Sequence, residues 1–458
     1  MRRDVESMVA SDRAGNLSRP SVRPRRFRLP AYPLVAALLG VVLGLGLVEV
    51  GLRVITPRSS AFYLWPPNFR LSMQPDPDVL PGVQGESRFI VNSQGIRGPE
   101  MGPRRQDEYR ILAIGGSTTE SFYLDQSEAW PHLLGETLGS TADGRSVWVG
   151  NIGRSGHVTQ QHILAMLYAL PQYDVDALVF LIGANDLYGR LYQDTDYDPY
   201  FFDKEANRLA LFPRTFSVIL PQDDPAWEWY RRTRMWDLAR TAKRTLLAKK
   251  AARGFGFTQD ETGKIFRHLR EHRRSGSIVE GLPDLASALD EYERNITRLV
   301  EIGRKRGLRM VFLTQPTLYR AGLTTAETDL LWAGGIGNFV MEPGHAYYSA
   351  EAMAAGMDAY NRRLLEVCGR LALECMDLAR AVPKNADMFL DDAHFTEAGA
   401  RRVAEVVAGY FRERPPFTTV AADGRARQRG AGRERLQALG PGREAAGPGA
   451  GNPEASDE

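Results

Sequence analysis

Short continuous runs of apolar residues alternate with longer segments of helical periodicity from residue 110 to residue 411. A continuous apolar run is typical of a strand that is buried on both faces, and such strands form parallel sheets covered by helices. The pattern therefore predicts an α/β protein, a three-layer α/β/α sandwich with a five-stranded parallel sheet and any site at the carboxyl ends of the strands. Strands are predicted at Ile111–Ile114, Val147–Val149 with Asn151 and Ile152, Ala177–Ile182, Met310–Leu313 and Leu373–Asp377, and helices through Trp130–Leu134, Ile163–Leu170, Leu285–Val300, Glu351–Cys368 and Ala400–Val407.

A different pattern occupies the N-terminal region, where residues 29–48 carry no charge. At about 1.5 Å per residue, a helix of this length matches a bilayer core of roughly 30 Å. Arginines crowd the end of residues 1–28, which predicts a transmembrane anchor with a cytoplasmic N-terminus and the rest of the chain outside. A cleaved signal peptide is the alternative, although the run is long for one and no Ala-x-Ala site follows it. The flanking arginines and the length of the run disfavour a buried helix of a soluble protein.

The domain organisation follows from these patterns and from composition. Many prolines and aromatic residues precede the first strand, which indicates an irregular neck with one short strand and turn at Phe89–Gly98. The C-terminal tail is rich in Arg, Gly and Ala with few apolar residues, and it is expected to be disordered. The predicted organisation is a cytoplasmic Arg-rich segment at 1–28, an anchor at 29–52, an extracytoplasmic neck at 53–106, the α/β domain at 107–413 with an insertion at about 187–283, and a tail at 414–458.

Composition narrows the possible partners. A formal net charge of +2 argues against nucleic acid as the main partner. Cys368 and Cys375 are too few for a disulfide scaffold and lack zinc-ligand spacing, and nothing indicates a metal or an organic cofactor. The two cysteines flank a helix-to-strand turn, so a local disulfide outside the cytosol and two separate buried thiols are both open. The oligomeric state is not predicted.

The segment around Ser117 is the first candidate for chemistry. Ser117 follows the first predicted strand after Gly115 and Gly116, and a helical segment comes next. The glycines allow a sharp turn, and a helix start offers free N–H groups to a developing negative charge. A serine nucleophile needs these donors, whereas the competing interpretation makes the serine a helix N-cap.

Three further polar blocks stand at the same predicted edge of the sheet. Gly156 follows the second strand, Asn185 follows the third, and Asp391 and His394 precede the last helix. An Asp and a His three residues apart can hydrogen-bond, so that the carboxylate orients the imidazole toward a serine. Each residue alone has a structural explanation as a loop glycine, a turn residue, a helix cap or a satisfied polar side chain. Their common placement at one edge favours a shared site.

Through these residues, the chain resembles the SGNH hydrolases, also called GDSL esterases, over residues 87–411. The four family blocks are matched by Gly115–Ser117, Asn151–Gly156, Gly183–Asp186 and Asp391–His394. One departure is Gly116, where the family often has Asp. Another is the long separation of the third and fourth blocks, which contains the insertion. The resemblance implies a flavodoxin-like SGNH fold and a serine hydrolase.

The resemblance also implies residue roles. His394, held by Asp391, removes the proton from Ser117 as it attacks an ester carbonyl. The backbone N–H groups of Ser117 and Gly156 and the side-chain amide of Asn185 form the oxyanion hole. Water then releases the acyl group, or a second alcohol accepts it, and the same residues serve both outcomes.

The insertion bears on the substrate. Tyr188, Tyr192 and Tyr200 follow Asn185 and are expected near the mouth of the site, where aromatic faces suit sugar rings; packing of the insertion explains them equally well. Residues 231–253 read as a basic amphipathic helix, facing either anionic lipid or polysaccharide, or simply solvent. The favoured function is a membrane-anchored esterase or deacylase that removes short acyl groups, acetyl above all, from cell-envelope or extracellular glycans, in the bacterial inner membrane facing the periplasm or exterior. The alternatives are an O-acyltransferase, a lipid esterase, and a glycan-binding protein on an inactive hydrolase fold.

Overall fold

The computed structural model of the protein describes residues 31–55, 61–204, 215–220, 228–240, 242–243 and 262–418. The predictions for the Arg-rich segment at 1–28, for the tail after residue 418, and for much of the insertion and of the basic segment at 231–253 lie outside the described residues. The chain divides into two compact units, which are described separately. One contains Met1–Arg58 and Pro225–Arg240, and the other contains Ser59–Asp224 and Thr241–Glu458.

The larger unit contains the predicted five-stranded parallel sheet, and all five predicted strands are confirmed. The strand order is β11-β9-β6-β4-β5, with every neighbouring pair parallel. Every residue of β6 is buried, because helices cover both faces of the sheet. The direction of strand addition reverses at β4, so the carboxyl ends of β4 and β6 flank the position where ligands bind in such sheets. The strands are β4 (Glu108–Gly115), β5 (Ser146–Asn151), β6 (Ala177–Leu181), β9 (Arg309–Leu313) and β11 (Glu374–Met376).

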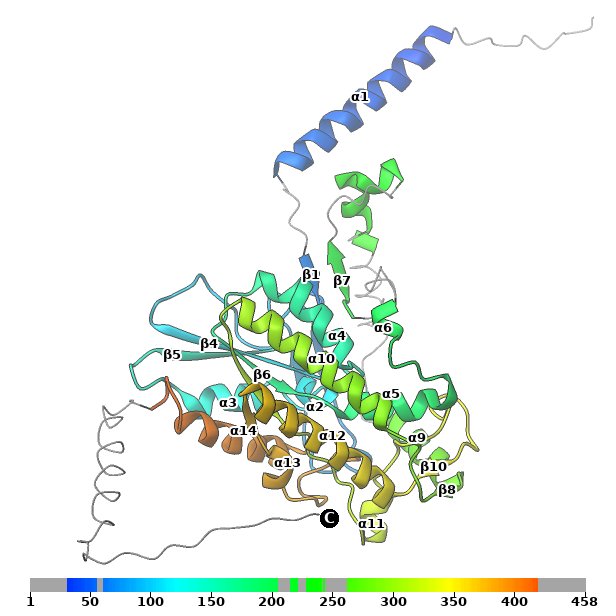
Figure 1. Cartoon of the computed structure of the whole chain (residues 1–458). Helices are drawn as coiled ribbons and strands as arrows, with labels where there is room; N and C mark the ends of the chain where they lie inside the picture. The colour runs from blue at the N-terminus through cyan, green and yellow to red at the C-terminus, as the bar shows by residue number, and fades with distance from the viewer. Residues whose placement is uncertain are drawn as a thin grey trace, which may run out of the picture. The chain divides into compact units, whose positions relative to one another are not determined.

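Helices form the two outer layers (Figure 1). On one face α3 packs against α14, and on the other α10 packs between α4 and α12. Side-chain caps begin two of these helices, since Ser349 accepts from the Ala352 N–H and Thr396 accepts from the Gly399 N–H. The helices are α2 (Ser117–Glu120), α3 (Trp130–Leu138), α4 (Thr159–Leu164, continued by a π-helical turn over Ala165–Ala169), α5 (Ala184–Gln193), α6 (Phe201–Lys204), α9 (Lys264–Ser275), α10 (Ala286–Lys305), α11 (Thr325–Thr328), α12 (Ala350–Leu371), α13 (Leu378–Ala381) and α14 (Glu397–Arg412).

Residues 61–106, predicted as a neck, lie in the same compact unit as the sheet. The predicted strand in this segment is present, and it pairs antiparallel with a neighbouring strand. Part of the insertion also joins the segment through a short antiparallel pair. These small sheets are formed by β1 (Ala61–Tyr63) with β7 (Val218–Leu220), β2 (Arg70–Met73) with β3 (Ser87–Ile90), and β8 (Ile278–Val279) with β10 (Tyr347–Tyr348).

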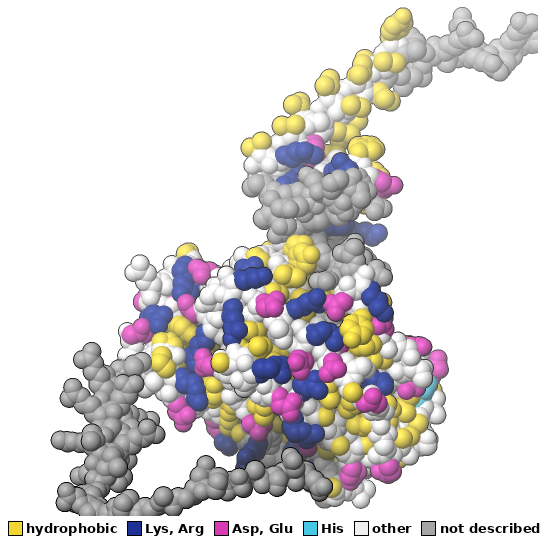
Figure 2. Space-filling view, viewed as in Figure 1, with side chains coloured by type: hydrophobic (Ala, Val, Ile, Leu, Met, Phe, Trp, Pro, Cys, Tyr) yellow, Lys and Arg dark blue, Asp and Glu magenta, His cyan; other side chains and the backbone are white. Residues whose placement is uncertain are grey.

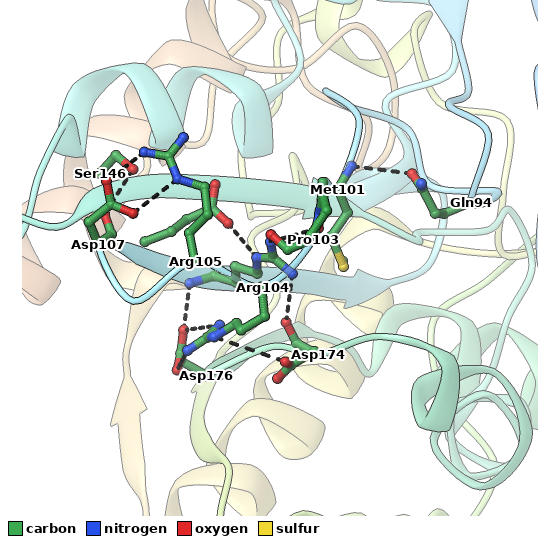
Figure 3. A network of polar contacts seen from close by, with 12 residues as sticks. Gln94, Met101, Pro103, Arg104, Arg105, Asp107, Ser146, Asp174 and Asp176 are labelled. Atoms are coloured by element: carbon green, nitrogen blue, oxygen red, sulfur yellow. Dashed lines mark hydrogen bonds and ion pairs between the residues drawn. The ribbon is translucent and has the colours of Figure 1, made fainter.

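Polar contacts tie the end of this segment to the amino ends of the sheet strands (Figure 3). The Arg104 guanidinium reaches the Asp176 carboxylate, with 2.6 Å between Nη2 and Oδ1, and lies 4.0 Å from Asp174. The Ser146 N–H and hydroxyl both donate to the Asp107 carbonyl at 2.8 and 3.1 Å. This network lies at the opposite end of the strands from the predicted site, so its role is structural.

Helix α1 (Ala31–Ile55) forms the smaller unit together with residues 228–240. Its segment Val35–Ile55, with mean hydropathy 2.3, is the one helix among the described residues that is long and apolar enough to cross a membrane. Apolar side chains cover its surface in Figure 2. Near its end, the Glu49 carboxylate accepts from the backbone N–H groups of Arg234 and Met235, where a second helical segment begins.

Cys368 and Cys375 form a disulfide, with their Cα atoms 6.1 Å apart. The bond joins the last turn of α12 to β11, and this separation is ordinary for such a bridge. Of the two possibilities open from the sequence, the structure contains the local disulfide.

Candidate active site

One cavity opens at the carboxyl edge of the sheet and encloses about 380 Å³, including its mouth. Segments that follow all five strands contribute to it, as the parallel topology predicts. Ser117, Asn185 and His394, which are far apart in the sequence, all line it. The lining residues are Gly116, Ser117, Thr118, His157, Leu181, Ile182, Gly183, Ala184, Asn185, Tyr188, Gln315, Trp332, Ala333, Asp392, Ala393 and His394.

Ser117 is the first residue of α2, immediately after β4. Gly116 occupies the N-cap position and makes no side-chain cap, so the competing view of Ser117 as the helix cap does not hold. Gly115 is required by close approach, because a Cβ there would lie 2.4 Å from the Leu181 carbonyl oxygen of the neighbouring strand. The helix ends after one turn at Ser121, which adopts a left-handed conformation with φ 51°. The result is a sharp turn with a half-buried serine at its start.

Asp391 and His394 make the predicted pair. His394 Nδ1 lies 2.7 Å from Asp391 Oδ2, and this distance assigns the proton to Nδ1 and leaves Nε2 as an acceptor. The other carboxylate oxygen, Oδ1, accepts from the backbone N–H groups of Ala393 and His394 at 3.0 and 2.8 Å. Trp332 Nε1 adds a fourth donor, 2.9 Å from Oδ2. The fully buried carboxylate is therefore held by four hydrogen bonds.

These contacts shift the pKa values of both groups. Burial alone would raise the pKa of the Asp391 carboxyl, but the charge of His394 and the hydrogen bonds lower it to about 2. For His394, burial favours the neutral imidazole, yet attraction and hydrogen bonding to Asp391 outweigh it and raise the pKa above its ordinary value of 6.5. Asp391 is thus ionised across the physiological range, and it favours the imidazolium that a general base becomes.

Asn185 lies in the first turn of α5 and reaches across to the loop after β5. Its Nδ2 donates to the His157 carbonyl at 2.9 Å. Gly156, the residue before His157, adopts φ +75° and is exposed; it is not among the residues that line the cavity. The structure therefore brings Asn185 together with Ser117 and places Gly156 one residue away from the cavity wall.

Asp392 was not expected to contribute to the site. Its Oδ1 accepts from the Tyr319 hydroxyl at 2.8 Å, and its Oδ2 accepts from the backbone N–H groups of Trp332 and Ala333 at 2.9 and 3.1 Å. Burial and the neighbouring charge of Asp391 raise the pKa of this carboxyl. The doublet Asp391-Asp392 was the available signal, since two adjacent acids before a helix exceed the need for one cap.

Two buried charged side chains, Glu120 and Arg97, support the turn that carries Ser117, and neither role was predicted from the sequence. The Glu120 carboxylate accepts from both the N–H and the hydroxyl of Ser155, which joins α2 to the loop after β5. Arg97 donates to the carbonyl groups of Glu120 and Ser121 at the end of α2 and to that of Leu124 in the turn that follows. Burial raises the pKa of Glu120 and lowers that of Arg97 to about 10. Both side chains hold the polypeptide turn that presents Ser117.

The three tyrosines predicted at the mouth occupy different places. Tyr188 lines the cavity, and its hydroxyl lies 3.1 Å from that of Tyr319. Tyr192 is exposed, with its hydroxyl 3.3 Å from Asn338 Oδ1. Tyr200 is also exposed, and a guanidinium covers its ring at 4.5 Å. Only Tyr188 among the three lines the cavity.

The described residues contain no cluster of three or more His, Cys, Asp or Glu side chains able to hold a metal ion. The cavity provides a serine, a histidine hydrogen-bonded to a carboxylate, and an amide donor. These groups can perform nucleophilic acyl chemistry.

Comparison with family models identifies the family of the chain. The model of the GDSL-like Lipase/Acylhydrolase family matches residues 113–402. Similar solved structures include a putative lipolytic protein of the G-D-S-L family from Desulfitobacterium hafniense (8% identity, 66% of this chain and 99% of that chain, TM-score 0.33) and the acetylxylan esterase Axe2 from Geobacillus stearothermophilus (13%, 66% and 93%, 0.35). A carbohydrate acetylesterase family member from Sinorhizobium meliloti is also similar (12%, 67% and 98%, 0.34). A search of curated proteins finds no match.

Proposed function

The chain belongs to the GDSL-like lipase/acylhydrolase family, the SGNH hydrolases, and is a carboxylic ester hydrolase, and from this premise we propose that Ser117, His394 and Asp391 are its catalytic triad. The observation that carries the proposal is that Ser117 and His394 line the same cavity, and that His394 Nδ1 is hydrogen-bonded to the buried carboxylate of Asp391. This arrangement leaves Nε2 as the atom that can receive the serine proton.

The reaction starts when His394 Nε2 takes the proton from Ser117 Oγ and the oxygen attacks the ester carbonyl. The negative charge on the tetrahedral oxygen is stabilised by the Ser117 N–H and by Asn185 Nδ2, and the N–H of Gly156, one residue away from the cavity wall, is the third proposed donor. One hydrogen of Asn185 Nδ2 is used by His157, and the second remains for the oxyanion. As the intermediate collapses, the histidine gives the proton to the leaving alcohol, and water then cleaves the acyl-serine by the same steps.

The proposed substrates are short acyl esters, acetyl above all, on a glycan. The cavity of about 380 Å³ includes its mouth, and its lining mixes polar groups such as Gln315 and His157 with the rings of Tyr188 and Trp332. A long acyl chain requires an extended apolar groove, which this lining does not supply. Tyr188 is the proposed sugar contact inside the cavity, whereas Tyr192 and Tyr200 could meet only the outer part of a polymer.

The proposed location is the membrane. Residues 29–52 would form a single anchor with residues 1–28 in the cytoplasm, leaving the segment 53–106 and the domain 107–413 outside. The exposed apolar surface of α1 supports an anchor, and the arginines before it support this orientation. The disulfide between Cys368 and Cys375 supports a compartment outside the reducing cytosol.

A panel of nitrophenyl esters from acetyl to octanoyl, run on the detergent-solubilised full chain, tests this function. Acetyl and propionyl esters should react faster than octanoyl esters, and Ser117→Ala should lower turnover by about 10⁴-fold while abolishing labelling by a fluorophosphonate. Faster octanoyl cleavage would favour a lipid esterase, and labelling that persists in Ser117→Ala would place the nucleophile elsewhere. With an acetylated glycan as donor, release of free acetate rather than an acetylated acceptor separates a hydrolase from an acyltransferase.

A further inference from the structure

The loop at residues 330–333 is held in place by two arginines of α9, a helix within the insertion. Arg270 Nε donates to the Leu330 carbonyl at 3.0 Å, and Arg273 donates to the Ala333 carbonyl at 2.7 Å. Both arginines are at least nine-tenths buried. Arg270 also donates to the carbonyl of Leu390, the residue before the triad aspartate. The insertion therefore connects this loop directly to the segment that carries Asp391.

Asp392 fixes the same loop through the loop's backbone N–H groups. Its Oδ2 accepts from two successive backbone N–H groups, those of Trp332 and Ala333, at 2.9 and 3.1 Å. A carboxylate bonded to two adjacent amides defines both the position and the direction of a loop. Arginine donors on the carbonyl groups and a carboxylate on the N–H groups together leave Trp332 with a defined orientation.

The Trp332 side chain then meets the triad and the cavity at once. Its Nε1–H donates to Asp391 Oδ2 at 2.9 Å, and the same oxygen accepts from His394 Nδ1 at 2.7 Å. Its ring packs edge-on against Phe266 of α9, with ring centroids 5.6 Å apart. Trp332 also lines the cavity that contains Ser117.

We propose that Trp332 has two roles in the reaction proposed above: it positions the triad carboxylate through its indole N–H, and its ring limits the size of the acyl group. The first role follows from sharing one oxygen between two donors. A carboxylate that loses a donor becomes a stronger base, so it stabilises the imidazolium more and the pKa of His394 rises. The second role follows from the position of the ring at the cavity wall, because a smaller side chain there leaves space for a longer acyl chain.

Other titratable and charged side chains also act on the Asp391–His394 pair. They are Asp392, Glu120, Arg270, Tyr123 and Tyr188, and Arg273 acts on Asp392. The substitution Trp332→Phe removes the indole N–H and keeps an aromatic wall, and it replaces none of these side chains.

The experiment compares pH profiles of kcat/KM for nitrophenyl acetate in the solubilised full chain. In Trp332→Phe, the acidic limb should move to higher pH by about half a unit, while the preference for acetyl over hexanoyl ester is kept. Trp332→Ala should raise the hexanoyl-to-acetyl ratio of kcat/KM by about tenfold. Trp229→Phe, which changes an exposed indole of the smaller unit, is the matched control and should change neither quantity.

An unchanged acidic limb in Trp332→Phe would overturn the positioning role, and an unchanged acyl ratio in Trp332→Ala would overturn the size limit. If Trp332→Ala does not fold, Trp332→Leu replaces it, because leucine retains much of the packing volume and still shortens the wall. Ser117→Ala in the same assays separates this inference from the proposed triad. Full activity in Ser117→Ala means that the triad is wrong, whereas loss of activity there with unaltered Trp332 variants means that only the present inference fails.

Discussion

A Cβ atom on Gly116 would lie 2.4 Å from Nδ2 of Asn185. Gly116 has an ordinary extended backbone with φ −83°, so conformational freedom is not the reason for a glycine here. The reason is space, because Asn185 lies over Gly116 while it donates to the His157 carbonyl. SGNH hydrolases often have Asp at the position of Gly116. The glycine found here is thus coupled to the position of the Asn185 amide, which is proposed to bind the oxyanion.

Gly116→Ala should therefore act like a mutation of Asn185 itself. Displacing the amide should lower kcat by about 10²-fold, within the range of roughly 10²–10³-fold expected for Asn185→Ala. The double mutant should be little worse than either single mutant, because both changes remove the same donor. Gly102→Ala is the control, since a Cβ there meets nothing within 4 Å. An unaltered kcat in Gly116→Ala with an intact fold would separate Asn185 from the oxyanion.

The sheet and the polar blocks could be predicted from the sequence because each depends on neighbouring residues. A strand buried on both faces leaves an uninterrupted apolar run, as Ala177–Ile182 does, and parallel topology places the polar residues after such runs at one edge. Asp391 and His394 are three residues apart, so their hydrogen bond is visible as local spacing.

Contacts between distant segments left no such pattern. Trp332 is separated from Asp391 by 59 residues, and Arg97 reaches Ser121 from the strand and turn predicted at Phe89–Gly98, whose local pattern gives no sign of this contact. The tyrosines show a related limit of local reasoning. Tyr188 faces the cavity, but Tyr192 lies one helical turn farther along α5, about 6 Å away along the axis, and so lies beyond the cavity lining.

The pH dependence of the reaction should report His394. The base must be neutral, and its pKa is raised above 6.5 because attraction to Asp391 outweighs the effect of burial. The value of kcat/KM should therefore be low in acid and rise with pH through that pKa. Asp391→Asn removes the charge that raises the pKa, so the limb should move to lower pH while turnover falls by about 10⁴-fold. Profiles of both proteins on a short acyl ester test this, and a limb that stays in place would assign it to another group.

The topology can be tested with a reporter that is active only outside the cytoplasm. Fused after Thr418, the last described residue, it should be active, and the full-length protein should sediment with membranes without being shortened. Replacing the arginines of residues 1–28 by glutamine should reduce reporter activity, since positive residues before a span retain that end in the cytoplasm. A soluble product that begins near residue 50 would instead identify α1 as part of a cleaved signal.

Asp186, next to Asn185, gives the fold a pH-dependent stability. Its Oδ1 accepts from the N–H and hydroxyl of Thr159 at 3.0 and 2.5 Å, whereas its buried Oδ2 has no hydrogen-bond partner among the described residues. Burial raises the pKa of this carboxyl to about 7; the bonds from Thr159 oppose the rise, and the charge of Glu291 adds to it. The folded protein therefore holds a proton at this carboxyl that the unfolded chain releases near pH 3.8.

The sign of the effect follows from that raised pKa. The stability contributed by protonated Asp186 is fully present below about pH 4 and is lost as the pH rises to about 7. Asp186→Asn keeps an acceptor for Thr159 and cannot ionise, so its melting temperature relative to wild type should increase by about 5 °C between pH 4 and pH 8. Asp78→Asn, at an exposed carboxylate, should show no comparable trend. Thermal melts of the three proteins between pH 4 and pH 8 test this pH-dependent stability. A difference in melting temperature between Asp186→Asn and wild type that does not vary with pH would mean that Asp186 is already ionised in the folded state.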